Sequence, residues 1–134
     1  MPFMTWTPEL ELPHEGINVQ HKALVAAVNA FAEAVRSAGE VDPMPTLVFI
    51  TRYAEEHFRD EEALMIAAAY PDYASHRATH QALFGDVQSR VEAYIVRGDS
   101  ATLLGFLEDW LRLHISGPDL VFARFLAARQ PPKG

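Results

Sequence analysis

Residues 54–68 read AEEHFRDEEALMIAA, and their spacing of apolar and polar residues is the strongest indication of the fold. Inward-facing positions around it recur in alternating steps of three and four residues, the spacing of one face of a helix packed at a small angle against its neighbours. The series expected to face inward in this segment is Leu47, Ile50, Ala54, His57, Glu61, Leu64 and Ala68. A histidine and a carboxylate therefore occupy positions where leucine or isoleucine would normally fill a core.

Three other segments repeat this spacing. Their inward series are Ile17, His21, Leu24, Val28, Phe31 and Val35 in 17–37; Tyr73, His76, His80, Leu83, Val87, Val91 and Tyr94 in 72–97; and Leu103, Leu107, Trp110 and His114 in 101–115. No segment alternates polar and apolar residues with a period of two, so strands are not expected. Four such helices joined by short loops predict an all-α, up-down-up-down four-helix bundle.

Proline and glycine mark the limits of the expected helices. Pro2, Pro8 and Pro13 indicate that residues 1–16 form an irregular N-terminal arm. Gly117-Pro118 should break the last helix, because Pro118 cannot donate a hydrogen bond to the His114 carbonyl and clashes with it. The expected helices are 17–37, 44–69, 72–97, 101–116 and, after that break, a short C-terminal helix at 118–129, all within one domain spanning 1–134.

The composition narrows the functional classes. Apolar residues make up 49% of the chain and charged residues 22%, as is typical of a globular protein, and the absence of cysteine excludes disulfides, thiolate nucleophiles and iron–sulfur clusters. A formal charge of −7 argues against nucleic acid as a partner. The N-terminus does not resemble a signal peptide, and no apolar stretch approaches the roughly 20 residues of a membrane-spanning helix. We expect a cytoplasmic protein without membrane insertion.

The polar residues on the inward seams are the candidate functional site. Five of the six histidines lie there, namely His21, His57, His76, His80 and His114, together with Glu61 on its seam and Asp119 just past the fourth. Burying such groups in an apolar core is costly unless something pairs with them, and a metal is the usual partner. A single core histidine, or one His-x-x-x-His pair, is common without a metal. That all four helices interrupt their apolar face is not explained in this way.

The number and type of these residues favour a particular metal. Five imidazoles and two carboxylates exceed the four ligands of a tetrahedral zinc site, and mixed nitrogen and oxygen donors do not suit calcium or magnesium. Two ions bridged by both carboxylates would use every ligand, and iron suits this set better than manganese. A ferritin-like site would need Glu-x-x-His on two helices, but the chain has only Glu11 to His14, across Pro13 in the arm. We expect His14, which lies off every seam, to be exposed and uninvolved.

With these residues in these positions, the chain resembles the hemerythrin family, and specifically its single-domain bacterial form, bacteriohemerythrin. The motifs that carry the resemblance are Trp6-Thr7-Pro8, Gln20-His21-Lys22, His57-Phe58-Arg59-Asp60-Glu61-Glu62, Tyr70-Pro71, His76-x-x-x-His80 and Trp110-Leu111-x-x-His114-Ile115-x-x-x-Asp119. They span nearly the whole chain, and all seven ligand positions of the family are filled.

The resemblance implies how the ligands are divided and what they do. It implies that His76, His80 and His114 bind one iron, that His21 and His57 bind the other, which keeps an open position for dioxygen, and that Glu61 and Asp119 bridge the two in an oxo- or hydroxo-bridged di-iron centre. The residues at the positions where the family lines its oxygen pocket are Leu24, Phe58, Trp110, Leu111 and Ile115. Each of these is equally well explained as ordinary core.

Three features depart from the family or from regular geometry. Asn18 stands three residues before the first histidine, where the family often has an acidic residue, and Leu12-Pro13-His14-Glu15 replaces a stretch that is commonly glycine-rich. Asp119 follows His114 by five residues, which in a regular helix would turn it about 140° away from the histidine. The break at Gly117-Pro118 is expected to return Asp119 to the cluster.

The leading function implied is reversible binding of dioxygen for storage, delivery or scavenging, by a protein that is not an enzyme. The alternatives are a di-iron enzyme that reduces oxygen, peroxide or nitric oxide, and an oxygen or redox sensor. The absence of a general acid or base beyond the ligands disfavours the enzyme, and the absence of a fused signalling domain disfavours the sensor. The expected partners are dioxygen and, in a delivery role, an oxygen-consuming enzyme. The chain is expected to be a monomer.

Overall fold

The computed structural model describes residues 2–129, which are helical from Glu15 onward apart from short connections. Its elements are the 3-10 turn η1 (Pro8–Leu10), α1 (Glu15–Arg36), α2 (Met44–Ala67), α3 (Tyr73–Arg97), α4 (Ser100–His114), the π-helix η2 (Ile115–Asp119) and α5 (Leu120–Arg129). Within these residues there is no strand, and no helix is both long and apolar enough to cross a membrane.

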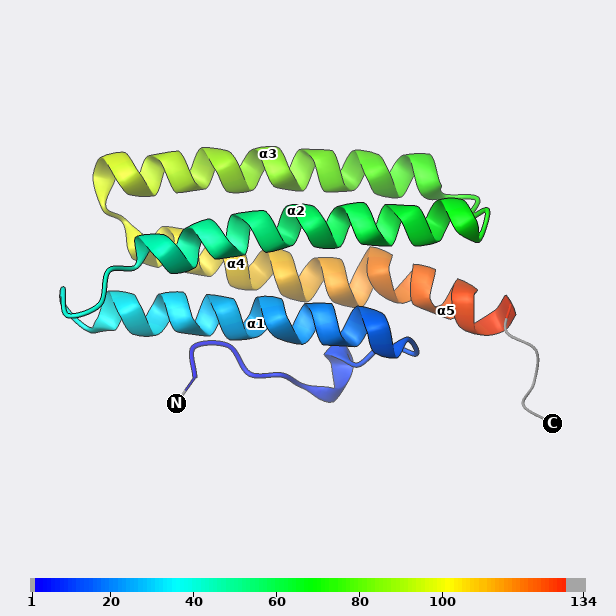
Figure 1. Cartoon of the computed structure of the whole chain (residues 1–134), viewed down its shortest axis with the longest axis horizontal. Coiled ribbons are helices and arrows are strands. Elements are labelled where there is room, and N and C mark those ends of the chain that lie inside the picture. Colours follow the sequence, from blue (N-terminus) through cyan, green and yellow to red (C-terminus); the bar gives the residue numbers. More distant parts are fainter. Residues whose placement is uncertain (1, 130–134) are drawn as a thin grey trace.

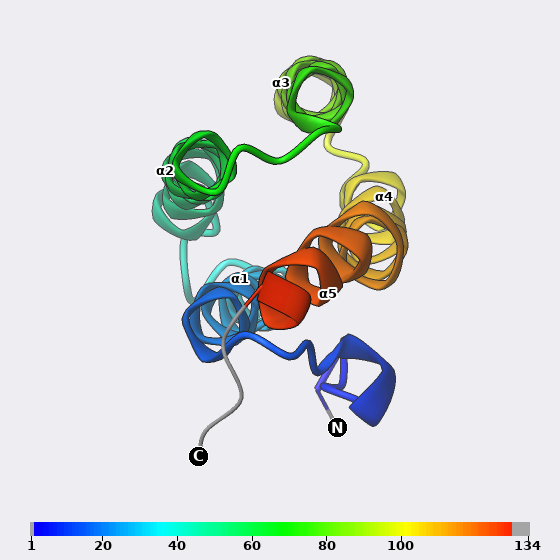
Figure 2. The ribbon, with the colours of Figure 1, turned by 90° about the vertical axis from the view of Figure 1, so that its right-hand side faces the viewer.

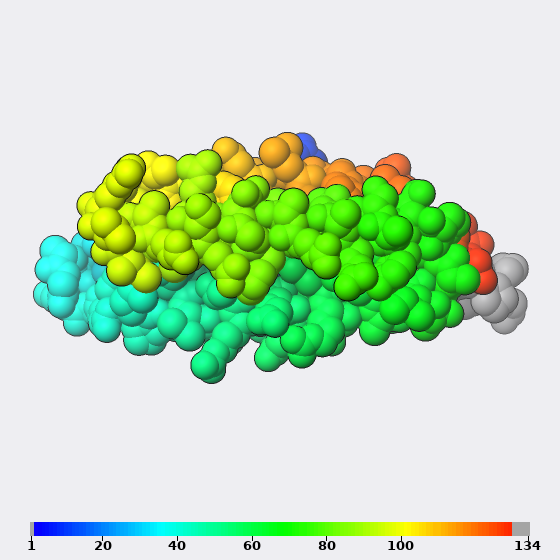
Figure 3. Space-filling view, turned by 90° about the horizontal axis from the view of Figure 1, so that it is seen from above, coloured from blue at the N-terminus to red at the C-terminus, as the bar shows by residue number. Residues whose placement is uncertain are grey.

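The four long helices run alternately up and down, and α5 follows α4 and packs Phe122 against Tyr70 and His76 at one end of the bundle (Figure 1). Viewed along the bundle, α1, α2, α3 and α4 stand at the corners of a square, and the N-terminal arm lies against the outside beside α1 (Figure 2). From above, α3 lies along α2 over most of the length of the molecule (Figure 3). The expected up-down-up-down bundle is confirmed.

The connections end and restart the helices through specific groups. Gly98 terminates α3 in the left-handed conformation, with φ 73°, which glycine adopts without a steric cost. Asp99 then caps α4, because its carboxylate accepts a hydrogen bond from the Thr102 amide at 3.1 Å. Asp42 similarly accepts from the Met44 amide at 3.0 Å before α2. The short connections keep neighbouring helices antiparallel.

The inward seams are largely as the spacing predicts, with one correction in α2. Leu47, Ile50, Ala54, His57 and Glu61 are all buried. Leu64 was expected next, but it is 38% exposed and Met65 is fully buried instead. The step after Glu61 is therefore four residues rather than three, because near its end α2 turns a slightly different face to the core.

The predicted break in the last helix takes the form of a π-helix rather than a gap. In η2 the Leu120 amide donates to the Ile115 carbonyl, five residues earlier, so the turn holds one extra residue. Pro118 lies inside this wider turn, where its missing N–H removes little. As a result α5 follows α4 without a gap (Figure 1) and slants toward α1 (Figure 2).

Two asparagines on α1 hold the N-terminal arm. Asn18 accepts a hydrogen bond from the Leu12 amide and donates one to the Leu12 carbonyl, both at 2.8 Å. Asn29 pairs in the same way with the backbone of Met4, at 2.7 and 2.8 Å. Leu12 and Met4 are buried, so each amide satisfies backbone groups that would otherwise be unpaired. The arm is therefore part of the core and not a loose extension.

We expect Asn18→Ala to lower the free energy of unfolding by about 2–3 kcal/mol, because it leaves the buried Leu12 N–H and C=O without partners. Asn29→Ala is the matched control: its contacts are only part-buried, so the loss should be about 1 kcal/mol. Urea denaturation of both variants measures the difference. Equal stability of Asn18→Ala and wild type would contradict the clamping role.

Candidate metal centre

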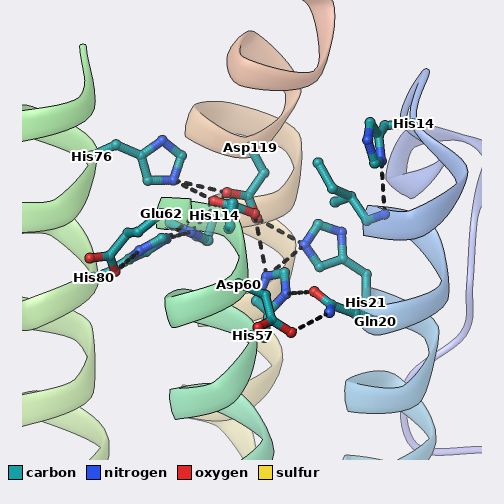
Figure 4. A network of polar contacts seen from close by, with 12 residues as sticks. His14, Gln20, His21, His57, Asp60, Glu62, His76, His80, His114 and Asp119 are labelled. Carbon is teal, nitrogen blue, oxygen red and sulfur yellow. Dashed lines mark hydrogen bonds and ion pairs between the residues drawn. The ribbon is translucent and has the colours of Figure 1, made fainter. Parts of the chain in front are cut away.

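The alternation of the helices brings residues from distant parts of the sequence to one height in the bundle. The first of these residues lies early in α1, two lie late in α2, two lie early in α3, one ends α4 and the last ends η2. Together the set is His21, His57, Glu61, His76, His80, His114 and Asp119, and all seven are buried, with exposed fractions of 6% or less. Figure 4 shows the imidazoles directed inward around Asp119.

Asp119 lies between histidines of three helices. Its Oδ1 is 3.0 Å from Nε2 of His76 and 3.0 Å from Nε2 of His114, and its Oδ2 is 2.9 Å from Nε2 of His21. The π-helix accounts for this position, because its extra residue returns Asp119 to the face that carries His114. The carboxylate thus spans both halves of the cluster.

Glu61 occupies an equivalent bridging position from α2. Its Oε1 is 2.8 Å from Nε2 of His76 and 3.3 Å from Nε2 of His80, while its Oε2 is 3.5 Å from Nε2 of His57. Glu61 and His57 are one helical turn apart and therefore share a face. The two carboxylates share His76, and between them they contact all five imidazoles.

The tautomers of two histidines follow from their outer contacts. Nδ1 of His57 is 2.6 Å from Oε1 of Gln20, and Nδ1 of His80 is 2.9 Å from Oε2 of Glu62. An amide oxygen and a carboxylate oxygen only accept hydrogen bonds, so both Nδ1 atoms donate. In the neutral imidazoles Nε2 then carries the lone pair, and in each residue Nε2 points into the cluster. This is the orientation that a metal ligand requires.

The polar atoms inside the cluster do not satisfy one another's hydrogen-bonding capacity. Nε2 atoms of His21 and His57 are 3.2 Å apart, as are those of His80 and His114. Both Oε atoms of Glu61 and Oδ2 of Asp119 are buried without a hydrogen bond of acceptable geometry, although imidazole nitrogens approach them closely. Lone pairs and carboxylate oxygens that converge without bonding are expected around cations, so the residues fit a metal centre.

The ligand atoms fall into two overlapping groups. One contains Glu61, His76, His80, His114 and Asp119, and the other contains His21, His57, Glu61 and Asp119; within each, all ligand atoms lie within 4.8 Å of one another. The two carboxylates belong to both groups. This arrangement can hold two ions side by side, one with five protein ligands and one with four.

The electrostatics of the cluster are dominated by burial and by these contacts. Burial lowers the pKa of His57 to about 4, and the Glu61 carboxylate offsets only part of this effect. Burial also opposes protonation of His76, but its contacts with Asp119 and Glu61 outweigh burial and raise its pKa to about 9. Burial favours the protonated form of Asp119, yet His114, His21 and His76 hold the pKa of this carboxyl well below its usual range. Asp119 therefore stays ionised, which suits a residue that could hold a cation.

Apolar and aromatic side chains surround the cluster. Leu24, Phe58, Trp110, Leu111 and Ile115, the residues expected to line an oxygen pocket, are all 5% exposed or less. The Phe58 ring stacks on His80 with centroids 4.1 Å apart and meets Trp110 edge-on at 6.0 Å. Leu107, one turn before Leu111, is also fully buried. The centre is therefore isolated from bulk water on these sides.

His14 differs from its expected role. It is only partly exposed, and its Nδ1 accepts a hydrogen bond from the Ile17 amide at 3.1 Å, so it caps the start of α1. Histidine is not a usual capping residue, which is why the sequence did not indicate this. It belongs to neither ligand group. Asn18, for its part, uses its hydrogen bonds on the arm, not on a histidine of the cluster.

Sequence reasoning missed the two residues that orient ligands from outside, Gln20 and Glu62. Both stand next to a candidate ligand in the sequence, His21 and Glu61, but each contacts a ligand on a different helix. Gln20 on α1 reaches His57 on α2, and Glu62 on α2 reaches His80 on α3. Only their adjacency to ligands offered a signal, and adjacency on a helix ordinarily places a side chain about 100° away from its neighbour.

Comparisons with known proteins agree with this geometry. The family model described as "Hemerythrin HHE cation binding domain" matches residues 12–126. The chain is 31% identical to bacteriohemerythrin from Ralstonia nicotianae, over 98% of this chain and 94% of that protein. It is 30% identical to bacteriohemerythrin from Methylococcus capsulatus, over 96% of this chain and all of that one. A wild-type hemerythrin crystal structure superposes with a TM-score of 0.81 at 27% identity, covering 93% of this chain and 98% of the other. The bundle, the seven buried residues and the match over residues 12–126 together establish that this chain belongs to the hemerythrin family.

Proposed function

We propose that this protein is a non-haem di-iron protein that binds dioxygen reversibly. The observation that carries the proposal is the convergence of five imidazole Nε2 atoms and two carboxylates into two overlapping ligand groups. In this proposal His76, His80 and His114 hold one iron, His21 and His57 hold the other, and Glu61 and Asp119 bridge them. The second group has four protein ligands against five, and so leaves room for a small ligand.

When bound, the two irons would supply the electrons and the open coordination position that reversible dioxygen binding needs. The protein residues have other tasks. The histidines and carboxylates fix the positions of the ions, and the hydrogen bonds from Nδ1 fix the ring orientations. The apolar side chains from α1, α2 and α4 exclude water, which limits irreversible oxidation.

The same surroundings favour a binding protein over an enzyme. Among residues 2–129, the buried side chains with a carboxylate or imidazole are the seven candidate ligands, and the buried amide of Asn18 is engaged with Leu12. The Tyr70 phenol is also buried, but burial and the nearby Asp72 and Glu61 carboxylates raise its pKa and make it a weaker acid, so no ready general acid or base stands beside the ligands. A carrier needs none, whereas reduction of oxygen or peroxide consumes protons. The bacteriohemerythrins to which the chain is similar support the same choice.

Protein produced in iron-replete cells should contain two irons per chain, and Glu61→Ala should lose most of this iron. Glu61 belongs to both ligand groups, so its removal leaves positive charge and imidazoles unmatched in a buried site. Elemental analysis of both proteins gives the measurement. One zinc per chain, or no metal, in the wild type would refute the di-iron assignment.

His14→Ala is the control for that measurement. It removes a histidine outside both ligand groups, so the iron content and the spectral response to oxygen should stay at wild-type levels. Loss of the cap on α1 should cost about 1 kcal/mol of stability. If His14→Ala lost iron while Glu61→Ala kept it, the assigned ligand set would be wrong.

Leu111→Asn should retain two irons but lose its oxygen-dependent spectrum faster than the wild type. The substitution keeps a similar size and adds an amide that can recruit water into the dry surroundings of the cluster. The buried amide should also lower the free energy of unfolding by about 1–3 kcal/mol. The measurement is the decay of the absorption spectrum after oxygen is added to the anaerobically reduced protein, at fixed pH.

Leu107→Asn provides the matched comparison, because Leu107 is equally buried one turn further from His114. It should show a similar loss of stability with a smaller change in the decay rate. Identical decay rates in the wild type and both variants would mean that Leu111 is core and has no role at the site.

A further inference from the structure

The two halves of the cluster have unlike partners on their outer side. In the group with five ligands, the outward Nδ1 of His80 donates to a carboxylate, Oε2 of Glu62, at 2.9 Å. In the group with four ligands, the outward Nδ1 of His57 donates to a neutral amide, Oε1 of Gln20, at 2.6 Å. Figure 4 places these two pairs on opposite sides of the cluster. The contacts have the same geometry but differ by one unit of charge.

The neutral partner is held in a defined orientation. Nε2 of Gln20 donates to Oδ2 of Asp60 at 3.0 Å, so the amide oxygen must be the atom that faces His57. The Gln20 amide therefore separates the Asp60 carboxylate from His57, whereas the Glu62 carboxylate contacts His80 directly. On that side, Arg77 approaches Glu62 with Nε to Oε1 at 3.6 Å, but Arg77 is 53% exposed and only weakly offsets the half-buried carboxylate.

A carboxylate that accepts the Nδ1–H of an imidazole draws its proton away and makes Nε2 a stronger electron donor. A neutral amide does this much less. Negative charge near a metal also stabilises its higher oxidation state. The side that contains His80 should therefore favour the more oxidised iron, and the side that contains His57 the more reduced one.

We propose that Glu62 and Gln20 are positioning residues that make the two iron sites electronically unequal, with Glu62 lowering the reduction potential of the iron held by His76, His80 and His114. The inference rests on the di-iron function proposed above. In the four-ligand group, which has room for a small ligand, the outer partner is the neutral amide of Gln20 and adds no negative charge. Gln20 and Glu62 would then have a role in the cluster, which each of them contacts through a single Nδ1 atom.

Two variants test this in opposite directions. Glu62→Gln keeps an acceptor oxygen for His80 and removes the charge. The double variant Gln20→Glu/Asp60→Asn keeps the hydrogen-bonded pair and the net charge of the chain, but moves one negative charge inward to His57. Redox titration of the iron-loaded proteins, followed by absorption, measures the midpoint potential of each, and iron transfer to a chelator measures retention.

Glu55→Gln is the matched control. Glu55 lies on the same helix as Glu62 and lines the same surface hollow of about 250 Å³, but it pairs with Arg59 at 3.2 Å and contacts no histidine of the cluster. It removes the same charge without touching a ligand. Any effect of overall charge would appear in this variant as well.

We expect Glu62→Gln to raise the potential by an amount equivalent to at least a tenfold change in the ratio of oxidised to reduced iron, about 59 mV for one electron. It should also release iron 10- to 100-fold faster. The double variant should lower the potential, and Glu55→Gln should leave it unchanged. A merely structural Glu62 would alter stability without moving the potential, so equal potentials in Glu62→Gln and Glu55→Gln, with iron present, would overturn the inference. A wild type without iron would instead overturn the proposed function, and this inference with it.

Discussion

Seven ionisable side chains share one buried volume in this protein, and the rest of the structure depends on that constraint. Burying five imidazoles and two carboxylates costs desolvation free energy. Hydrogen bonds do not offset it, because three of the four carboxylate oxygens accept no hydrogen bond. The residues therefore suit a site that cations would complete. The bundle then serves as a rigid frame, with apolar layers on both sides that hold the ligands at one height.

The frame solves a geometric problem that a regular helix would not. His114 and Asp119 are five residues apart and would face different directions on an α-helix. The single wide turn of η2 brings Oδ1 of Asp119 to 3.0 Å from Nε2 of His114 without breaking the helical course. π-Helical turns are uncommon and are often found at functional sites. Here the irregular turn brings the Asp119 carboxylate into both ligand groups.

Contacts beyond the ligands distinguish the two halves of the centre. Gln20 and Glu62 fix the tautomers of His57 and His80 in the same way, yet one is neutral and the other carries a charge. The hydrogen bond fixes the orientation of each ring, and the charge of its acceptor is the property by which we propose that the two sites differ electronically. The N-terminal arm contributes to the core instead. Asn18 and Asn29 attach it to α1, and its Met4 and Leu12 side chains are buried.

The sequence by itself determined the bundle and brought together the seven candidate ligands. Helical spacing reports which positions face inward, and histidines on those positions, such as His57 and His80, can only meet at the centre of the bundle. Contacts between helices were settled only in the folded chain, where Met65 rather than Leu64 turns inward and Gln20 and Glu62 reach ligands on neighbouring helices. The capping of α1 by His14 is a local contact that the sequence did not indicate, because histidine is not a usual cap. The reason is physical. Periodicity fixes the direction of a side chain from its own helix, whereas its partner depends on the distance and rotation of the next one.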